Sequence, residues 1–400
     1  MLILEQFHNA SEVLKEVIHP TPLVLSECFS KQSGNQVFLK PENMQLTGAY
    51  KIRGALYKIS KLSDEERRRG VVTASAGNHA QGVGFAAKKY GIKATVVMPT
   101  TAPIVKINNT KSYGASVILE GDIYDDAYAY AKWLAESTGA TFVHPFNDLD
   151  IVLGQGTVAL EIFEQLPNVD TLLIPVGGGG LAAGIGVVAK TLNPEVKVIG
   201  VEPTGAASVN FSLENNKVSS LEKVDTMADG VAVRTPGDLI FPYLQQYLDG
   251  VITVDDEELI EIFLDVLENH KMLVEYAGLL SLAALKHIDM KGKNIVCVLS
   301  GGNMDVITVS SVVQRGLRRR GRVFTFSVML PDRPGELHKI TGVIARLRGN
   351  VIKLEHNQFA SINRRADLEL KVTLESFGHE HKQEIIDKLT SEGYNVQLYG

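Results

Sequence analysis

A single lysine, Lys51, stands where a helix is predicted to begin, shortly after a Thr-Gly turn. Apolar Ala55, Leu56 and Ile59 follow at helical spacing, which predicts a buried face for this helix. The start of a helix is an unfavourable place for a cation, so a lysine there favours a specific purpose. With its stem packed and its amine in a cleft, Lys51 could form an imine with a carbonyl cofactor. The competing interpretation is an ordinary surface lysine.

Three polar, glycine-rich loops could complete a site around such an amine. Each loop directly follows a short apolar segment that is predicted to be a strand. In open α/β sheets, ligands bind at the carboxyl ends of parallel strands, so three loops of this kind are expected to converge. This convergence is stronger evidence than any single loop. The loops are residues 75–79 (Ser-Ala-Gly-Asn-His), 177–180 (four glycines) and 300–303 (Ser-Gly-Gly-Asn).

The four glycines lie between a predicted strand and a predicted helix. Glycines let backbone N–H groups converge, and the helix start adds positive potential, so the loop favours an anion such as phosphate. The alternatives are a dinucleotide site and a simple tight turn. The dinucleotide fingerprint misses its last glycine by one position, although Glu202 does end the next strand. The lysine of a Walker A motif is absent.

The other two loops offer neutral hydrogen-bonding groups. Ser75, Asn78 and His79 supply a hydroxyl, an amide and an imidazole, whose donors suit a carboxylate and whose amide suits a phenolic oxygen. The alternative is structural, because Ser75 or Asn78 would also cap a helix and His79 would also pack in a loop. Ser300 supplies a hydroxyl at a strand end, and its alternative is likewise a cap or turn.

These loops require elements that hold them in place. Two βαβ units predict parallel sheets with covering helices, and a βαββαβ pattern of about 80 residues near the C-terminus predicts a ferredoxin-like unit. A helix is also expected at 11–18. The first βαβ unit comprises residues 71–74, 81–90 and 94–98; the second comprises 171–176, 181–191 and 196–201; a further strand is 294–299; the C-terminal elements are 323–330, 336–347, 351–356, 367–373, 380–392 and 394–398.

Composition narrows the classes of protein that fit. The 400 residues predict two or three domains, and 45% hydrophobic with 22% charged residues are ordinary for a globular protein. A net charge of −6 argues against nucleic-acid binding. Two cysteines without a CxxC motif indicate a reducing compartment. We see no signal peptide, and glycines and Pro175 break the longest uncharged run, so we expect a cytoplasmic protein without a membrane span.

Lys51 and the three loops, in this order, resemble the fold-type II pyridoxal-phosphate enzymes (tryptophan synthase beta-like), and among them the threonine dehydratases. The resemblance covers residues 1–315, as an α/β catalytic domain with parallel sheets. Residues 323–400 resemble an α+β ferredoxin-like ACT domain, the amino-acid-binding module. The two glycines and four arginines of 316–322 are the expected hinge.

The resemblance implies a role for each motif. Lys51 would hold pyridoxal 5'-phosphate as an imine and then act as the base at Cα. The other implied cofactor contacts are Asn78 at the phenolic oxygen, Gly177, Gly178, Gly179, Gly180 and Leu181 at the phosphate, and Ser300 at the pyridine nitrogen. The implied substrate-carboxylate contacts are Ser75, Gly77 and His79. The implied effector loop is Asp332, Arg333, Pro334 and Gly335.

The implied reaction is β-elimination from L-threonine, which gives 2-oxobutanoate and ammonia, and from L-serine, which gives pyruvate. A hydroxyl at the pyridine nitrogen suits elimination better than transamination. Ala49-Tyr50 replaces the family's Ser-Phe before the lysine and adds a phenol to the pocket. Ala76 replaces a serine of the racemases, which disfavours racemisation. One carboxylate expected after Glu202-Pro203 is missing, so we expect no metal.

Three alternatives stay open at this point. They are a serine dehydratase or racemase, a transferase of the cysteine-synthase kind, and a cofactor-free amino-acid sensor. For the effector of the ACT-like domain we expect isoleucine or valine, bound near residues 332–335 at a subunit interface. Because single ACT domains pair across chains, we expect a homodimer or homotetramer, with neither nucleic acid nor membrane as partner.

Overall fold

The computed structural model describes residues 1–356 and 368–399, and the chain divides into two compact units, Met1–Asp305 and Val306–Gly400. Helix α14 spans Val306–Arg319, so the first four residues of the expected hinge at 316–322 are helical. The hinge itself stays a prediction. In the described part of the chain, no helix is both long and apolar enough to cross a bilayer.

The larger sheet of the first unit has the strand order β1-β2-β10-β7-β8-β9. Its strands are parallel except for β1, which is antiparallel to β2. Apolar runs such as 294–299 form strands that are buried on both faces, as in parallel sheets covered by helices. The strands are β1 Val24–Leu25, β2 Gln36–Pro41, β7 Thr171–Pro175, β8 Lys197–Pro203, β9 Gly250–Val254 and β10 Asn294–Leu299.

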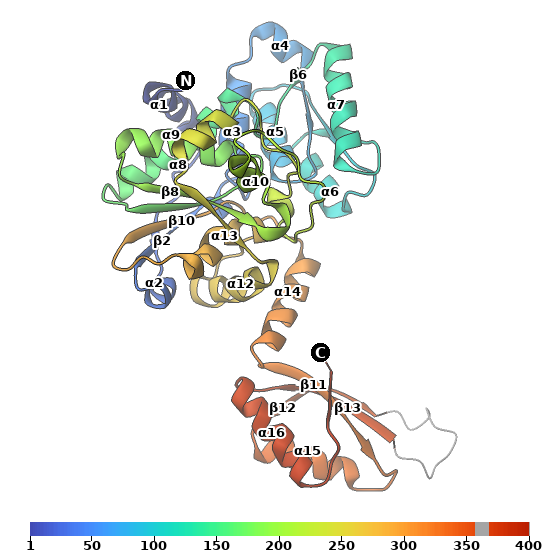
Figure 1. Ribbon diagram of the computed structural model, residues 1–400. Coiled ribbons are helices and arrows are strands. Elements are labelled where there is room, and N and C mark those ends of the chain that lie inside the picture. The colour runs from blue at the N-terminus through green and yellow to red at the C-terminus, as the bar shows by residue number, and fades with distance from the viewer. Residues whose placement is uncertain (357–367, 400) are drawn as a thin grey trace. The chain divides into compact units, whose positions relative to one another are not determined.

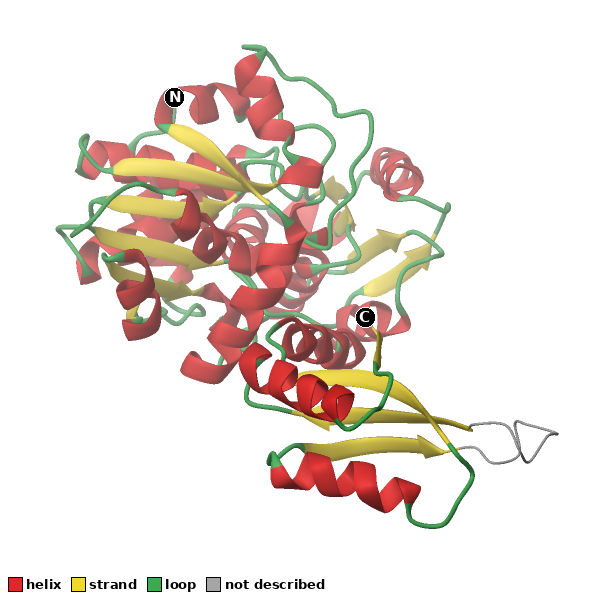
Figure 2. Cartoon of the chain, turned by 60° about the horizontal axis from the view of Figure 1, so that its bottom comes forward, coloured by secondary structure: helices red, strands yellow, loops and turns green. Residues whose placement is uncertain are grey.

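A second, smaller sheet has the order β5-β4-β3-β6 and is parallel throughout. The predicted parallel pairing of each βαβ unit is confirmed, with Val71 opposite Ala94 and Thr171 opposite Lys197. The two units lie in different sheets, which Figure 2 shows as separate groups of yellow strands. The strands are β3 Val71–Ala74, β4 Ala94–Met98, β5 Ser116–Leu119 and β6 Thr141–Phe142.

Helix α8 (Leu149–Gln165) contacts both α3 (Lys51–Ser60) and α9 (Gly180–Leu192). Glycines let the backbones meet. A Cβ on Gly154 of α8 would lie 2.6 Å from the Cα of Gly54 in α3. A Cβ on Gly184 of α9 would lie 2.8 Å from the N of Gly156 in α8. Helix α8 therefore fixes the helix that carries Lys51 relative to the helix that follows the four glycines.

The first helix corrects one prediction. It spans Leu4–Leu14 (α1) rather than 11–18, because Phe7, Ala10 and Leu14 form its buried face. The remaining helices of the unit are α2 Glu27–Ser33, α4 Asp64–Arg69, α5 Asn78–Lys89, α6 Ile104–Ser112, α7 Tyr124–Thr138, α10 Ser208–Glu214, α11 Phe241–Tyr247, α12 Asp256–His270 and α13 Tyr276–Ala283.

The second unit contains an antiparallel sheet of order β12-β13-β11-β14. Alternate residues of its central strands, such as Phe326 and Val372, pack with Ile344 and Ile385 of α15 and α16. These two helices contact each other, and Figure 1 labels them beside the strands of this sheet. This is the predicted ferredoxin-like order, although Asp367 of the fourth predicted segment lies outside the described residues. The elements are β11 Val323–Leu330, α15 Glu336–Arg346, β12 Asn350–His356, β13 Leu368–Glu375, α16 His379–Ser391 and β14 Gln397–Tyr399.

Candidate functional site

Lys51 is the first residue of α3, as the sequence predicts. Its Nζ donates a hydrogen bond to the backbone oxygen of Pro145 at 2.9 Å and lies 5.2 Å from the centre of the Tyr50 ring. Burial lowers the pKa of the Lys51 amine to about 8, although the nearby Glu275 carboxylate acts in the opposite direction. An amine with this pKa is neutral in a substantial fraction of molecules near pH 7.5, so it can attack a carbonyl or accept a proton.

Asn78 is the first residue of α5, and its side-chain amide is held at both ends. Its Nδ2 donates to Glu275 Oε1 at 2.6 Å, and its Oδ1 accepts from Asn303 Nδ2 at 2.9 Å. These two bonds fix which end of the amide is the donor. The second N–H of Nδ2 has no acceptor among residues 1–356 and 368–399, so it remains for a ligand.

Glu275 is a buried residue of this site that the sequence analysis missed. It precedes α13, and its backbone N donates to the oxygen of Gly301 at 3.0 Å. Burial raises the pKa of its carboxyl group to about 7, with the charge of Asp229 acting in the same direction. One signal was available in the sequence, because this acid is the only charged residue of the run at 272–285.

The loop at 300–303 lies against the turn before Lys51. The backbone N of Tyr50 donates to the oxygen of Ser300 at 3.1 Å, and the N of Gly302 donates to the oxygen of Gly48 at 2.8 Å. The side chain of Ser300 is buried. Two of the three predicted loops therefore meet at Lys51, because Asn303 also contacts Asn78.

The four-glycine loop reaches the same place through Phe146, the neighbour of Pro145. A Cβ on Gly178 would lie 2.3 Å from the Phe146 ring, so a larger residue does not fit there. Gly179 has φ +98°, a conformation that favours glycine. Within the described residues, no hydrogen bond uses the backbone N–H groups of 177–181 as donors. They stand at the positive end of α9, which suits a phosphate.

The loop at 75–79 has an open side and a buried side. A Cβ added to Gly77 would meet no atom within 4 Å, so there is space beside the backbone here. His79 is buried, and its Nε2 lies 3.0 Å from the backbone oxygen of Val143. Burial, followed by the charge of Lys51, lowers the pKa of His79 to about 3. The imidazole is therefore neutral.

The partner of Nε2 decides the tautomer of His79. Because a carbonyl oxygen only accepts, Nε2 must carry the proton, and Nδ1 is left as a bare acceptor. Nδ1 is buried and has no partner in the described chain. A bare acceptor does not bind a carboxylate, so the implied role of His79 at the substrate carboxylate stays a prediction, and the geometry favours contact with a ligand N–H or O–H.

The predicted effector loop, Asp332 to Gly335, lies in the second unit between β11 and α15. Gly335 caps α15 with φ +95°. The second unit also has a groove of about 270 Å³ on the sheet face away from α15 and α16. Its lining residues are Arg318, Thr325, Lys353, Glu355, Lys371, Thr373 and Tyr399.

Potential metal ligands do not gather in the parts of the chain that are described. No group of three or more His, Cys, Asp or Glu side chains there could hold a metal ion. Glu202 instead accepts hydrogen bonds from the backbone N of Val209 and Asn210 at 2.9 and 2.8 Å, at the start of α10. The expectation of no metal stays a prediction.

The chain is similar to known proteins in both sequence and fold. Residues 14–301 match the family described as pyridoxal-phosphate dependent enzyme. An L-threonine ammonia-lyase of Thermotoga maritima is 45% identical over 401 residues, which span 100% of both chains. Two solved structures are similar. The processed threonine deaminase isoform 2 of Solanum lycopersicum has a TM-score of 0.74 and 38% identity, and covers 78% of this chain and 93% of its own. Maize serine racemase has a TM-score of 0.75 and 35% identity, and the match covers 80% of this chain and 99% of the racemase chain.

Proposed function

Because the chain belongs to the family of pyridoxal-phosphate dependent enzymes, we propose that it is an L-threonine ammonia-lyase, which converts L-threonine into 2-oxobutanoate and ammonia and also L-serine into pyruvate. The observation that carries the proposal is Lys51, whose amine has a lowered pKa and lies beside three loops that offer hydrogen-bonding groups to a ligand. The likeness to the Thermotoga maritima ammonia-lyase, which extends over both whole chains, supports the choice of substrate.

The residues around Lys51 fit pyridoxal phosphate. A partly neutral amine suits its aldehyde, and the unused N–H of Asn78 suits its phenolic oxygen. The unpaired N–H groups of 177–181 suit its phosphate, and the buried hydroxyl of Ser300 suits its pyridine nitrogen. When bound, this cofactor withdraws electrons from the substrate and makes its Cα proton acidic.

The side chains of the chain then have distinct tasks. Lys51 Nζ accepts the Cα proton, for which a pKa of about 8 is well matched near neutral pH. Ser75 and the open space at Gly77 receive the substrate carboxylate. Glu275 and Asn303 hold the Asn78 amide in one orientation, so its donor is fixed before a ligand arrives.

A serine racemase is the second candidate, because maize serine racemase has a similar fold over 80% of this chain. The residue at position 76 distinguishes the two. A racemase needs a second acid–base group on the opposite face of the substrate, and Ala76 has no such group. Chiral analysis after incubation with L-serine decides between them, since only a racemase accumulates D-serine.

The first test is an absorbance spectrum of the purified protein before and after L-threonine, with 2-oxobutanoate measured alongside. We expect an imine band that changes with threonine, and oxo acid from the wild type but not from Lys51→Ala. A band without turnover of threonine or serine would overturn the ammonia-lyase assignment. Absence of any band in protein reconstituted with pyridoxal phosphate would overturn the cofactor assignment as well.

We also propose that isoleucine or valine regulates the enzyme by binding at residues 332–335, that it is a homodimer or homotetramer, and that it acts in the cytoplasm. The ferredoxin-like fold of the second unit supports the regulatory role. Arg333→Gln should remove the response to the amino acid, whereas Arg318→Gln in the groove should not. The opposite result would move the effector to the groove, and sedimentation analysis would give the oligomeric state.

A further inference from the structure

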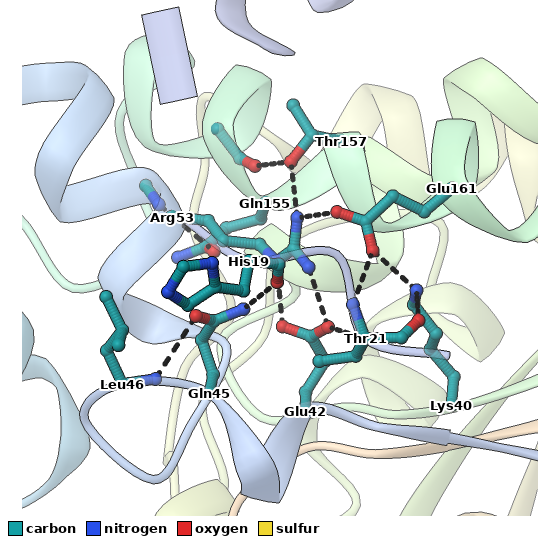
Figure 3. Close-up of polar contacts among 12 residues, drawn as sticks. His19, Thr21, Lys40, Glu42, Gln45, Leu46, Arg53, Gln155, Thr157 and Glu161 are labelled. Atoms are coloured by element: carbon teal, nitrogen blue, oxygen red, sulfur yellow. Dashed lines mark hydrogen bonds and ion pairs between the residues drawn. The ribbon is translucent and has the colours of Figure 1, made fainter. Parts of the chain in front are cut away.

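Four charged side chains, three of them buried and one partly exposed, face one another at the Lys51 helix (Figure 3). Two are basic and two are acidic, so their formal charges cancel. The side chains of Lys40 and Glu42 are 0% exposed, that of Arg53 is 1% exposed and that of Glu161 is 13% exposed. We call these four residues the Arg53 network. Removing this many charges from water costs free energy even when each charge is paired. Such an arrangement therefore indicates a role beyond stability.

Arg53 stands at the centre of the network. Its Nε and Nη2 donate to both oxygens of Glu42, at 2.7 and 2.8 Å, which is the fork geometry that only arginine offers. Its Nη1 donates to Glu161 Oε1 at 2.6 Å and to Thr157 Oγ1 at 3.2 Å. Figure 3 shows the guanidinium between these partners. Arg53 thus joins α3 to Glu42, the residue that follows β2, and to α8.

The remaining acceptors are also used. Lys40 Nζ donates to Glu161 Oε2 at 2.5 Å and to the backbone oxygen of Thr21 at 2.6 Å. The Thr21 hydroxyl donates to Glu42 Oε1 at 2.7 Å. Burial acts to raise the pKa of Glu42, but the charge and hydrogen bonds of Arg53, together with Lys40 and Thr21, outweigh burial and hold the pKa below its usual value. The Glu42 carboxylate therefore stays charged near neutral pH and keeps its pairing with Arg53.

The network acts on the turn of α3 that carries Lys51. In a helix, residues two apart point to nearly opposite sides, so Arg53 holds the turn from the side away from the Lys51 amine. The N of Gly54 donates to Gln155 Oε1 at 3.2 Å, which ties the same turn to α8. A Cβ on Gly82 of α5 would lie 3.2 Å from the backbone C of Lys51, so α5 blocks movement on another side.

We propose that Arg53, through Glu42 and Glu161, is a positioning residue for the Lys51 amine. It fixes the rotation and depth of the first turn of α3, so that Nζ meets the ligand rather than the solvent. The inference rests on the proposed function only in that Lys51 is the amine that takes the cofactor. The Arg53 network then acts in cofactor binding as well as in the stability of the fold.

The chain offers a matched control in the same pair of helices. Lys58 of α3 pairs with Asp148 and Asp150 at the start of α8, at 2.9 and 3.0 Å, and its side chain is 19% exposed. Lys58 lies two turns after Lys51, and its ion pairs do not hold the first turn of α3. Loss of this pair should weaken the α3–α8 contact without moving the Lys51 amine.

The experiment compares Arg53→Lys with Lys58→Met in the full chain, freed of cofactor and then titrated with pyridoxal phosphate. Lysine keeps the charge but not the fork. For Arg53→Lys we expect the dissociation constant to rise about tenfold, which corresponds to about 1.4 kcal/mol. We also expect the pKa of the Lys51 amine, measured from the pH dependence of its acylation, to rise toward the ordinary lysine value. Lys58→Met should change neither quantity.

A second variant covers the case in which Arg53→Lys does not fold. Arg53→Met with Glu42→Gln removes one charge of each sign and leaves the Lys40–Glu161 pair balanced, a kind of change that folds often tolerate. It should unfold at a temperature close to the wild type and still bind pyridoxal phosphate more weakly. If a folded Arg53 variant matches Lys58→Met in both affinity and amine pKa, the proposal is wrong. Turnover by Lys51→Ala would instead refute the proposed function. The binding measurements above do not depend on turnover, so the two failures can be told apart.

Discussion

The Arg53 network of the first unit and the Lys353–Glu355 pair of the second unit hold their charges in opposite ways. In the first unit, Arg53, Glu42 and Lys40 are buried, and each has at least two polar partners. In the second unit, the side chains of the Lys353–Glu355 pair in the groove are 66% and 46% exposed. Buried pairs resist rearrangement because any lost partner leaves an unpaired charge, whereas exposed pairs exchange readily with water or a ligand.

This difference suits two different tasks. A site that aligns an amine with a cofactor gains from groups that cannot move, and the Arg53 network and the α3–α8–α9 glycine contacts supply them. A unit that changes its contacts when it binds an effector, as we propose for the second unit, tolerates exposed pairs that exchange their partners. The comparison therefore predicts large effects for substitutions in the first unit and small ones for matched substitutions in the second.

The largest effect is expected when one partner of the Arg53 network is removed. Glu42→Ala leaves the Arg53 guanidinium buried without its main acceptor, which should lower the free energy of unfolding by about 3–5 kcal/mol. Urea denaturation followed by tryptophan fluorescence measures this, because the one tryptophan, Trp133, lies in the first unit. Hydrogen exchange in urea gives the free energy of unfolding of the second unit. The comparison would fail if Glu355→Ala lowered that free energy by as much as Glu42→Ala lowers that of the first unit.

A pH dependence of stability is expected from Glu275 in the first unit and not from Glu355 in the second. The folded-state pKa of Glu275 is raised by burial from 4.5 to about 7, so the folded chain binds the extra proton in this range. Its contribution to the free energy of unfolding is about 3 kcal/mol. This contribution is fully present below pH 4.5 and is lost as the pH rises through 7. Glu275→Gln should remove this slope from the cofactor-free protein. Equal slopes for wild type and Glu275→Gln would show that the carboxyl is not protonated.

The carboxyl of Glu355 provides the contrasting case. Its hydrogen bond with Lys353 lowers its pKa, so any contribution is present above its unfolded pKa and is lost as the pH falls through the folded one. Because the pair is exposed, we expect no measurable slope. Denaturation curves of the wild type and of Glu355→Gln are recorded at pH 3.5 and at pH 7. The change in the free energy of unfolding between the two pH values should be the same for both proteins. A large divergence would mean that the groove is covered in solution.

A smaller effect is expected at the four-glycine loop. A Cβ at Gly178 would overlap the Phe146 ring, and displacement of that ring disturbs the N–H groups at the start of α9. Gly178→Ala should weaken pyridoxal phosphate binding about tenfold, or about 1.4 kcal/mol. Gly250→Ala is the control, because a Cβ there meets nothing within 4 Å. Equal affinity in both variants would mean that the loop does not contact the phosphate.

The sequence predicts local features of this site well and distant ones poorly. The strand 294–299 and the helix start at Lys51 follow from short apolar patterns, and both have the predicted position. Pro145 and Glu275 contact the site from segments 94 and 197 residues away from their partners Lys51 and Asn78. Pairings at such separations depend on how strands are ordered into sheets, and periodicity carries no information about that order. For the same reason the sequence does not assign the two βαβ units to different sheets.

The smallest effect is expected at Gly77, and its direction is informative. The backbone there has ordinary φ −129°, and a Cβ would project into open space, so Gly77→Ala should fold like the wild type. If that space receives the substrate carboxylate, the added methyl group should raise KM for L-threonine several-fold and leave the affinity for pyridoxal phosphate unchanged. Steady-state kinetics beside cofactor titration separates the two quantities. A weaker cofactor complex with unchanged KM would place the cofactor, rather than the substrate, beside Gly77, and an unchanged protein would show that nothing binds there.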